Sequence, residues 1–181
     1  PVANPQTASE LLHMAVALAH PENGKVIALI VSTGTMENEA SAIEELQPVI
    51  DELEEEGHSI TLETVSSTSI ARGILDAARE QGADLIILGI RQPSRGQVIL
   101  GTVVENVIAT APSDVLIYRS SSQDNVDIKR IVIPVDEVLQ AQSAARTGIR
   151  LARRNNLRIE AMYVQPRYRS QYEGLAYIER T

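Results

Sequence analysis

Short apolar runs alternate with longer amphipathic stretches along most of the chain. The apolar runs are rich in β-branched residues, which is typical of buried strands. The stretches between them place apolar residues at i, i+3, i+4 and i+7, the spacing of one helix face. Pro48 falls inside one expected helix and should kink or split it. Strands are expected at 25–31, 58–65, 83–90 and 114–118, and helices at 8–19, 40–56, 69–81 and 103–109.

This alternation predicts a fold class. Short strands separated by helices indicate parallel strands joined by right-handed crossovers, and hence a doubly wound α/β sheet. Helices are then expected on both faces of the sheet. In such sheets a ligand binds beyond the carboxyl ends of the strands, so the loops that follow the strands are the first place to search for a site.

The pattern restarts after a polar stretch at 121–127. An apolar run at 128–135 is followed by an amphipathic segment at 140–154 and another apolar run at 158–164. Sliding the sequence on itself by 133 positions aligns Pro1–Val31 with Pro134–Val164 without a gap, and eight of the 31 pairs are identical. A period of this length indicates a repeated domain rather than a solenoid unit.

Both copies of the repeat are expected to be incomplete. The run 128–133 precedes Pro134, but its counterpart before Pro1 is missing, so the first copy should lack most of its first strand. We expect a fragment of a longer chain, with a domain at 1–120, a linker at 121–127 and the first half of a second domain at 128–181. The strand 128–135 is a candidate to fill the vacant first-strand position, as in a circular permutation.

Composition and charge narrow the functional classes. The chain has no Cys, which excludes disulfide scaffolds, thiolate zinc sites and cysteine nucleophiles. No apolar run approaches the roughly 18 residues of a membrane span, and no signal-peptide pattern is present, so we expect a cytoplasmic region without membrane insertion of its own.

The charge is uneven along the chain. Residues 1–120 hold 6 Lys/Arg and 17 Asp/Glu, whereas 121–181 hold 10 and 7. The net negative charge of residues 1–120 argues against a nucleic-acid partner, because such binding is driven by basic residues that neutralise phosphates. Arginines at helical spacing within 146–158 leave contact with nucleic acid or anionic lipid as an alternative, and a solvated helix face as the simpler interpretation.

The segment from Ala83 to Arg119 begins Ala-Asp-Leu-Ile-Ile-Leu-Gly-Ile-Arg and ends Leu-Gly-Thr-Val-Val-Glu-Asn-Val-Ile-Ala-Thr-Ala-Pro-Ser-Asp-Val-Leu-Ile-Tyr-Arg. It resembles the last strand-loop-helix-strand unit of the universal stress protein family. The resemblance covers 1–120 as one domain and 128–164 as half of a second. It implies a five-stranded parallel sheet with four helices, ATP binding as in many members, and a dimer through the last strand.

The resemblance also implies where a nucleotide binds. Nucleotide-binding members carry a loop G-x2-G-x9-G-(S/T), in which backbone amides approach the phosphates at a helix N-terminus. The first Gly is Gly89, but Gln92 replaces the second, and only 8 residues, 93–100, separate it from the closing Gly-Thr pair. The acidic position after the first strand is Ala3, whereas the second copy keeps it as Asp136. The implied adenine-nucleotide contacts are Val2, Ala3, Val31, Gly89, Arg91, Gly101, Thr102 and Val103.

Several of these residues also have a simpler interpretation. Arg91 and Arg95 are suited to bidentate phosphate contacts, or they are solvated loop arginines. Gly101 is either part of a phosphate cradle or a turn before a helix, and Thr102 is either a ligand contact or an N-cap.

Neither a metal site nor a catalytic set is visible. His13 and His20 lie seven residues apart and His58 opens a strand, which is no metal-ligand pattern. No nucleophile has a base and an orienting acid beside it. We therefore expect no enzyme, and no metal beyond nucleotide-bound magnesium.

Two functions remain open, and a third interpretation concerns the parent chain. The first is a regulatory or sensing domain that binds an adenine nucleotide. The second is a ligand-free interaction module, in which Asp114–Tyr118 is an edge strand that forms a homodimer or a tandem pseudo-dimer. The opening Pro-Val-Ala-Asn-Pro-Gln-Thr-Ala also resembles universal stress domains at the cytosolic end of amino-acid permeases and cation/proton antiporters. That resemblance implies the soluble regulatory domain of a transporter.

Overall fold

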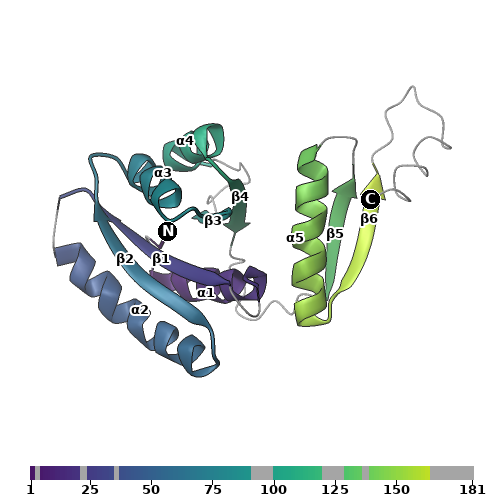
Figure 1. The fold of residues 1–181 in the computed structure, drawn as a ribbon, viewed down its shortest axis with the longest axis horizontal. Coiled ribbons are helices and arrows are strands. Elements are labelled where there is room, and N and C mark those ends of the chain that lie inside the picture. The colour runs from purple at the N-terminus through teal and green to yellow at the C-terminus, as the bar shows by residue number, and fades with distance from the viewer. Residues whose placement is uncertain are drawn as a thin grey trace. The chain divides into compact units, whose positions relative to one another are not determined.

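The structure is a computed structural model that describes residues 1–2, 5–20, 24–34, 37–90, 100–119, 129–135 and 139–163. The chain divides into two compact units, Pro1–Asp124 (unit 1) and Asn125–Thr181 (unit 2). Unit 1 contains α1 (Pro5–Leu18), β1 (Lys25–Ser32), α2 (Glu37–Glu55), β2 (Ser59–Ser66), α3 (Ile70–Glu80), β3 (Leu85–Ile90), α4 (Thr102–Thr110) and β4 (Asp114–Arg119) (Figure 1).

The strands of unit 1 form two parallel pairs. β1 pairs with β2, with Lys25 opposite Ser59, and β3 pairs with β4, with Leu85 opposite Asp114. No ladder joins β1 to β3 within the part of the chain that the structure describes. Parallel strands linked by helices confirm the predicted α/β class, whereas one hydrogen-bonded sheet of five strands stays a prediction.

Helix α2 differs from the expectation at its proline. Pro48 lies inside α2, yet the helix runs unbroken from Glu37 to Glu55, so the expected split is wrong. The proline lies on the exposed face of the helix, one turn after exposed Glu44, whose carbonyl can bond water instead of an amide. Burial of Leu46 and Leu53 on the opposite face holds both halves of the helix in place.

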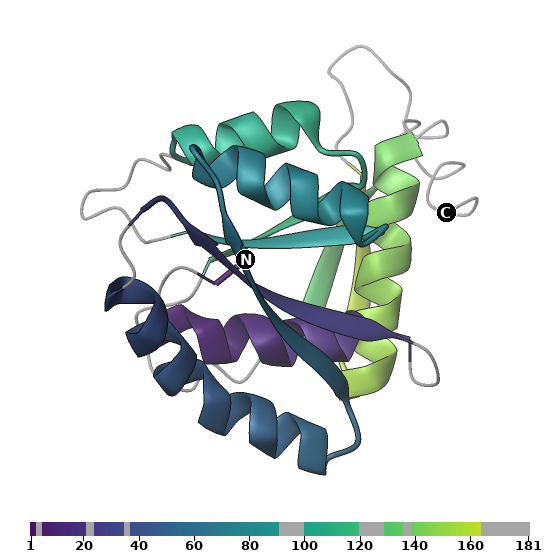
Figure 2. The same ribbon diagram turned by 60° about the vertical axis from the view of Figure 1, so that its left-hand side comes forward.

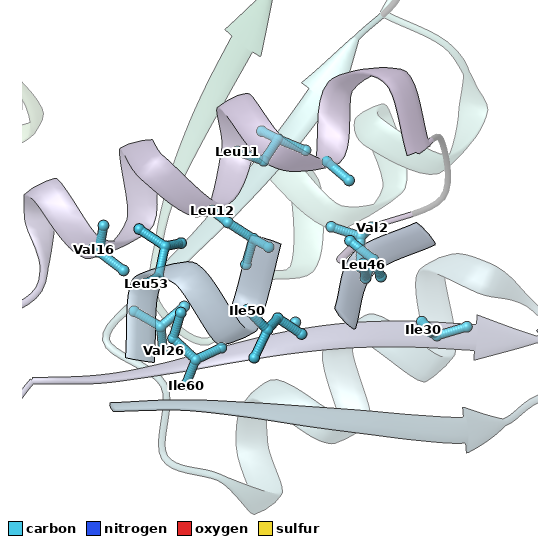
Figure 3. Packing of buried hydrophobic residues seen from close by; sticks show 12 residues of the cluster. Val2, Leu11, Leu12, Val16, Val26, Ile30, Leu46, Ile50, Leu53 and Ile60 are labelled. Atoms are coloured by element: carbon cyan, nitrogen blue, oxygen red, sulfur yellow. The ribbon is translucent and has the colours of Figure 1, made fainter. Parts of the chain in front are cut away.

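Two hydrophobic clusters build the core of unit 1 on opposite faces of the strands. α1 and α2 cover one face and α3 and α4 cover the other (Figure 2). On the first face Leu53, which is 1% exposed, lies near Val16 and Val26, and Val2 lies beside Leu46 (Figure 3). β3 belongs to both faces, because Ile87 packs against the α1–α2 cluster while Leu88 is part of the α3–α4 cluster.

Unit 2 is a strand-helix-strand unit. It contains β5 (Arg130–Val135), α5 (Leu139–Asn155) and β6 (Arg158–Tyr163), and β5 pairs in parallel with β6 over its whole length. One edge of β5 is therefore occupied by β6. That β5 fills the missing first-strand position of unit 1 stays a prediction.

Candidate functional site

The candidate site of unit 1 lies where its strands end. β1 ends at Ser32 and β3 ends at Ile90, and α4 begins at Thr102. In parallel strands the carboxyl ends share one side of the fold, where loops and helix N-termini meet. The predicted nucleotide contacts Val31 and Gly89 are the second-last residues of β1 and β3.

Gly101 has a backbone conformation that suits a close approach to a ligand. It precedes α4 with φ 82° and ψ 150°, a region that only glycine adopts readily. Apart from its two chain neighbours, no described residue has an atom within 4 Å of a Cβ built at this position. The first amides of α4, which lack acceptors inside the helix, therefore meet no other described residue at Gly101.

The role expected for Thr102 as an N-cap is wrong. Gly101 occupies the N-cap position, and its carbonyl accepts the first helical bond from the Glu105 amide at 3.0 Å. Thr102 is the first helical residue, and it is exposed. The structure thus agrees with a glycine that precedes a helix.

The structure brings some of the predicted contacts together and separates others. Half-buried Val31 and Val103 pack against one cluster, on the α3–α4 face. Val2 is buried in the cluster on the α1–α2 face. Gly89 faces the same helix layer as Val2, because a Cβ there would lie 3.0 Å from a methyl of Leu11. Ala3, Arg91, Gln92, Arg95 and Asp136 lie outside the described residues.

A turn at the end of β1 adds one residue that the sequence analysis did not single out. Ser32 is only 8% exposed, and its hydroxyl accepts a bond from the Gly34 amide at 3.4 Å. Its carbonyl accepts from the Ser67 amide at 2.9 Å, just beyond the end of β2. The only sequence signal for this turn is a small polar residue at the end of an apolar strand. The turn lies at the carboxyl end of β1, on the side of the strands where the candidate site was placed.

A second contact that the sequence analysis missed joins α1 to β4. The Tyr118 hydroxyl donates to Glu10 Oε2 at 2.9 Å. Burial, the bond to Glu10 and the charge of that carboxylate together raise the pKa of Tyr118 from 10.0 to about 12. The two residues are 108 positions apart in the sequence, so no local pattern could have revealed the pair.

The described residues hold no group of three or more His, Asp or Glu side chains that could bind a metal ion. The Nδ1–H of His13 donates to the Ser9 carbonyl at 2.8 Å, and His58 Nε2 lies 3.8 Å from Glu56 Oε2. Among the helices in the described part of the chain, none is long and apolar enough to cross a membrane.

Comparison with solved structures shows the fold. The universal stress protein of Archaeoglobus fulgidus superposes with a TM-score of 0.56 at 24% identity, covering 65% of this chain and 92% of that protein. A protein of Pseudomonas aeruginosa that is assigned as a universal stress protein superposes with a TM-score of 0.55 at 16% identity, covering 86% of this chain and 66% of the other. Both similarities concern the architecture alone.

Two sequence comparisons go further. The chain is 27% identical to the Na⁺/H⁺ antiporter NhaS5 of Synechocystis sp. over 188 aligned residues, which include 98% of this chain. It spans only 27% of the length of that antiporter. Residues 1–119 match the universal stress protein family, which confirms the resemblance noted in the sequence. The chain belongs to the universal stress protein family.

Proposed function

We propose that this chain is a cytoplasmic regulatory region of a cation/proton antiporter, and that unit 1 senses an adenine nucleotide. The observation that carries the proposal is the alignment of nearly the whole chain with one part of an antiporter. An alignment over 98% of the chain is expected if both units belong to that part of the transporter. A second copy of the universal stress domain, begun by unit 2, and a five-stranded sheet in unit 1 are parts of this proposal.

The nucleotide site of this proposal lies at the carboxyl ends of β1 and β3. The first amides of α4 are free to donate to phosphate oxygens, and the helix dipole favours an anion there. At Gly101 no described residue beyond its chain neighbours fills the space beside these amides. Half-buried Val31 and Val103 offer apolar surface from β1 and α4 on the same side of the strands, which suits a purine ring.

We infer a binding role rather than a catalytic one. Ala3 has no carboxylate to hold a ribose, and Gln92 replaces a glycine of the phosphate loop. Both departures should weaken binding relative to family members with the full motif. The role is then to report the nucleotide concentration to the transporter by a change in stability or contacts, with magnesium present only as part of the bound nucleotide.

The first test is a thermal-shift assay of the 181-residue chain with ATP, ADP, AMP and cyclic di-adenosine monophosphate, with and without magnesium. A ligand at 100 times its dissociation constant adds about 2.7 kcal/mol of stability. For a domain of this size that raises the melting temperature by several degrees. We expect such a shift for at least one of the four nucleotides.

A pair of glycine variants separates a phosphate cradle from a simple turn. Gly101→Val should abolish the nucleotide-dependent shift, because the side chain fills the space beside the α4 amides. Gly82→Val is the matched control, since Gly82 also has positive φ (61°) and no neighbour within 4 Å of its Cβ, but it follows α3 at the opposite ends of the strands. Equal nucleotide shifts in both variants would contradict a site at Gly101.

A ligand-free interaction module is the second candidate, and the free edge of β4 favours it. β4 pairs with β3 on one side only, and the described strands leave its other edge open. An open edge is a template for pairing with another strand. No shift with any nucleotide, in a chain that unfolds cooperatively, would put this function first.

A further inference from the structure

The described part of unit 2 is strongly basic. Its only acidic residue is Glu160, whereas its Lys and Arg residues are Lys129, Arg130, Arg146, Arg150, Arg153, Arg154 and Arg158. Over 121–181 as a whole, 10 basic residues stand against 7 acidic ones, while 1–120 hold 6 basic and 17 acidic residues. The two units are therefore suited to partners of opposite charge.

The tertiary structure gathers five of these basic residues at one end of unit 2. β5 and β6 are parallel and begin at the same end, with Arg130 opposite Arg158. The Arg158 amide donates to the Lys129 carbonyl at 3.1 Å. α5 connects the two strands and stops at this end (Figure 1), where its last turn carries Arg153 and Arg154. We call these five exposed residues the basic end.

The described residues compensate only part of this charge. Glu160 Oε1 lies 3.1 Å from Nη1 of Arg130 and 3.8 Å from Nε of Arg158, so one carboxylate is shared by two guanidinium groups. Arg153 and Arg154 lie at the negative end of the α5 dipole, which is equivalent to about half a charge. Together these do not balance five cations, and an anionic partner would reduce their mutual repulsion.

A row of arginines along α5 leads to the basic end. Arg146, Arg150 and Arg154 follow one another at i, i+4 spacing, so they share one side of the helix, and all three are exposed. Ala145 and Ala152 are buried on the side that packs against the strands. The positive surface of unit 2 therefore comprises this row together with the basic end.

The sequence repeat shows that the fold does not require these arginines. Both copies form a helix followed by a strand, α1 and β1 in unit 1 and α5 and β6 in unit 2. With the shift of 133 positions, the arginines at 146, 150, 153, 154 and 158 align with His13, Ala17, His20, Pro21 and Lys25. Only one of these counterparts is Lys or Arg. The arginines of unit 2 are thus better explained by a partner than by folding.

We propose that the basic end and the arginine row of α5 dock on a membrane surface that contains anionic phospholipids. This inference rests on the proposed function, because a region of a cation/proton antiporter lies next to a bilayer. Guanidinium groups bind phosphate oxygens through paired hydrogen bonds. Each Lys or Arg near an anionic bilayer strengthens binding about fivefold. The contact is peripheral and needs no inserted segment.

The side chains of unit 2 favour lipid over nucleic acid. Proteins that bind single-stranded nucleic acids commonly stack the bases on aromatic side chains. Among the described residues of unit 2 the one aromatic side chain is Tyr163, which is the last residue of β6 and packs against the α5 cluster. It lies at the opposite end of the strand from Arg158, so the basic end offers charge without a stacking platform.

The test is co-sedimentation of the 181-residue chain with lipid vesicles. One set contains phosphatidylcholine alone, and the other has phosphatidylglycerol as roughly one lipid in three. At ~0.1 M salt the Debye length is about 10 Å, so negative charges of unit 1 farther than this from the lipid are screened. We expect binding only to the anionic vesicles and its loss at ~1 M salt. A folded chain that does not bind them would overturn the proposal.

Two double variants with the same net charge locate the surface. Arg153→Gln with Arg154→Gln should lower the partition coefficient about 25-fold. Arg72→Gln with Arg79→Gln is the matched control, since it removes two exposed arginines from α3 of unit 1, and it should bind like the parent chain. Arg153→Lys with Arg154→Lys keeps the charge and should also bind. Equal losses in the two Gln variants would overturn the proposal.

A third double variant guards against a folding defect. Arg146→His with Arg150→Ala introduces the residues that α1 holds at the same positions of the repeat. At pH 8, where an exposed His is neutral, it should again weaken binding about 25-fold. Urea unfolding identifies which variants are folded, and unchanged binding by a folded variant of the row would show that α5 takes no part.

Other partners give different results. If RNA at a lower phosphate concentration than the lipid releases the chain from the vesicles, the partner is a nucleic acid and the proposal fails. Self-association without vesicle binding, abolished by Arg153→Gln with Arg154→Gln, would identify an acidic surface of a second copy instead and would also overturn it. The nucleotide thermal shift is measured without vesicles, so the failure of nucleotide sensing and the failure of membrane docking are separate results.

Discussion

At the scale of single residues, glycines set how closely helices approach the strands. A Cβ on Gly73 of α3 would lie 2.6 Å from Cγ1 of Val31, and a Cβ on Gly148 of α5 would lie 2.9 Å from Cδ1 of Ile133. The two contacts differ in kind. Val31 is stiff at χ1 because it is β-branched, whereas the Ile133 atom is the far end of a flexible side chain.

Gly73→Ala should therefore destabilise the chain by about 1–3 kcal/mol, the usual cost of overpacking a well-packed site. The gain of up to ~1 kcal/mol in helix propensity offsets only part of this cost. The measurement is urea unfolding of the variant and the parent chain. Gly148→Ala is the matched control, for which we expect a clearly smaller loss.

A double variant tests the cause. Val31→Ala removes the methyl groups that an alanine at position 73 would strike, so the cost of Gly73→Ala should fall markedly in the Val31→Ala background. An unchanged cost would show that the effect comes from somewhere other than the contact between α3 and β1.

At the scale of elements, β4 combines a paired edge with an open one. Its ladder with β3 runs from Leu85 opposite Asp114 to Ile90 opposite Arg119. Its side chains are mostly half-buried, so the strand is anchored in unit 1 while its outer backbone groups remain without a strand partner in the described residues.

Proline substitutions at neighbouring β4 positions test whether this edge forms a dimer. Because successive amides point to opposite edges, one of Leu116→Pro and Ile117→Pro removes an outer amide and the other removes a bond to β3. If the chain dimerises through β4, the variant that keeps native stability should become monomeric in light scattering. A stable variant that stays dimeric would place the interface elsewhere.

At the scale of the whole of unit 1, the bond between Tyr118 and Glu10 ties the first helix to the last strand. Glu10 lies on α1, which belongs to the helical layer that also covers β1. One polar bond therefore spans elements from the two ends of the unit, and its strength depends on the protonation of the phenol.

This bond predicts a loss of stability at alkaline pH. The pKa of Tyr118 is about 12 in the folded chain, above the ordinary tyrosine value of 10.0, so the unfolded state releases its proton first. The stabilising contribution is complete below pH ~10 and is lost as the pH rises from ~10 to ~12. Unfolding free energies in this window should fall less steeply for Tyr118→Phe than for the parent chain, and equal slopes would contradict the assignment.

The sequence alone determined the helices and strands, the α/β class and the family. The helices, the strands and the class follow from apolar periodicity, which acts over a few residues. The family follows from the resemblance of the segment Ala83 to Arg119. The expectation for Pro48 failed because propensity does not report which face of α2 is buried. The cap alternative for Thr102 is wrong because the backbone of Gly101 decides where α4 begins.

Only the tertiary structure decided which elements meet. It paired Tyr118 with Glu10, divided the strands of unit 1 into two pairs, and brought the Val2 amide into a hydrogen bond with the Leu29 carbonyl. Such contacts join residues far apart in sequence, and their energy depends on distance and burial in three dimensions. The nucleotide contacts drew on both sources. The resemblance in the sequence assigned them, and the fold placed Val31 and Val103 in one cluster and Val2 on the other face of the strands.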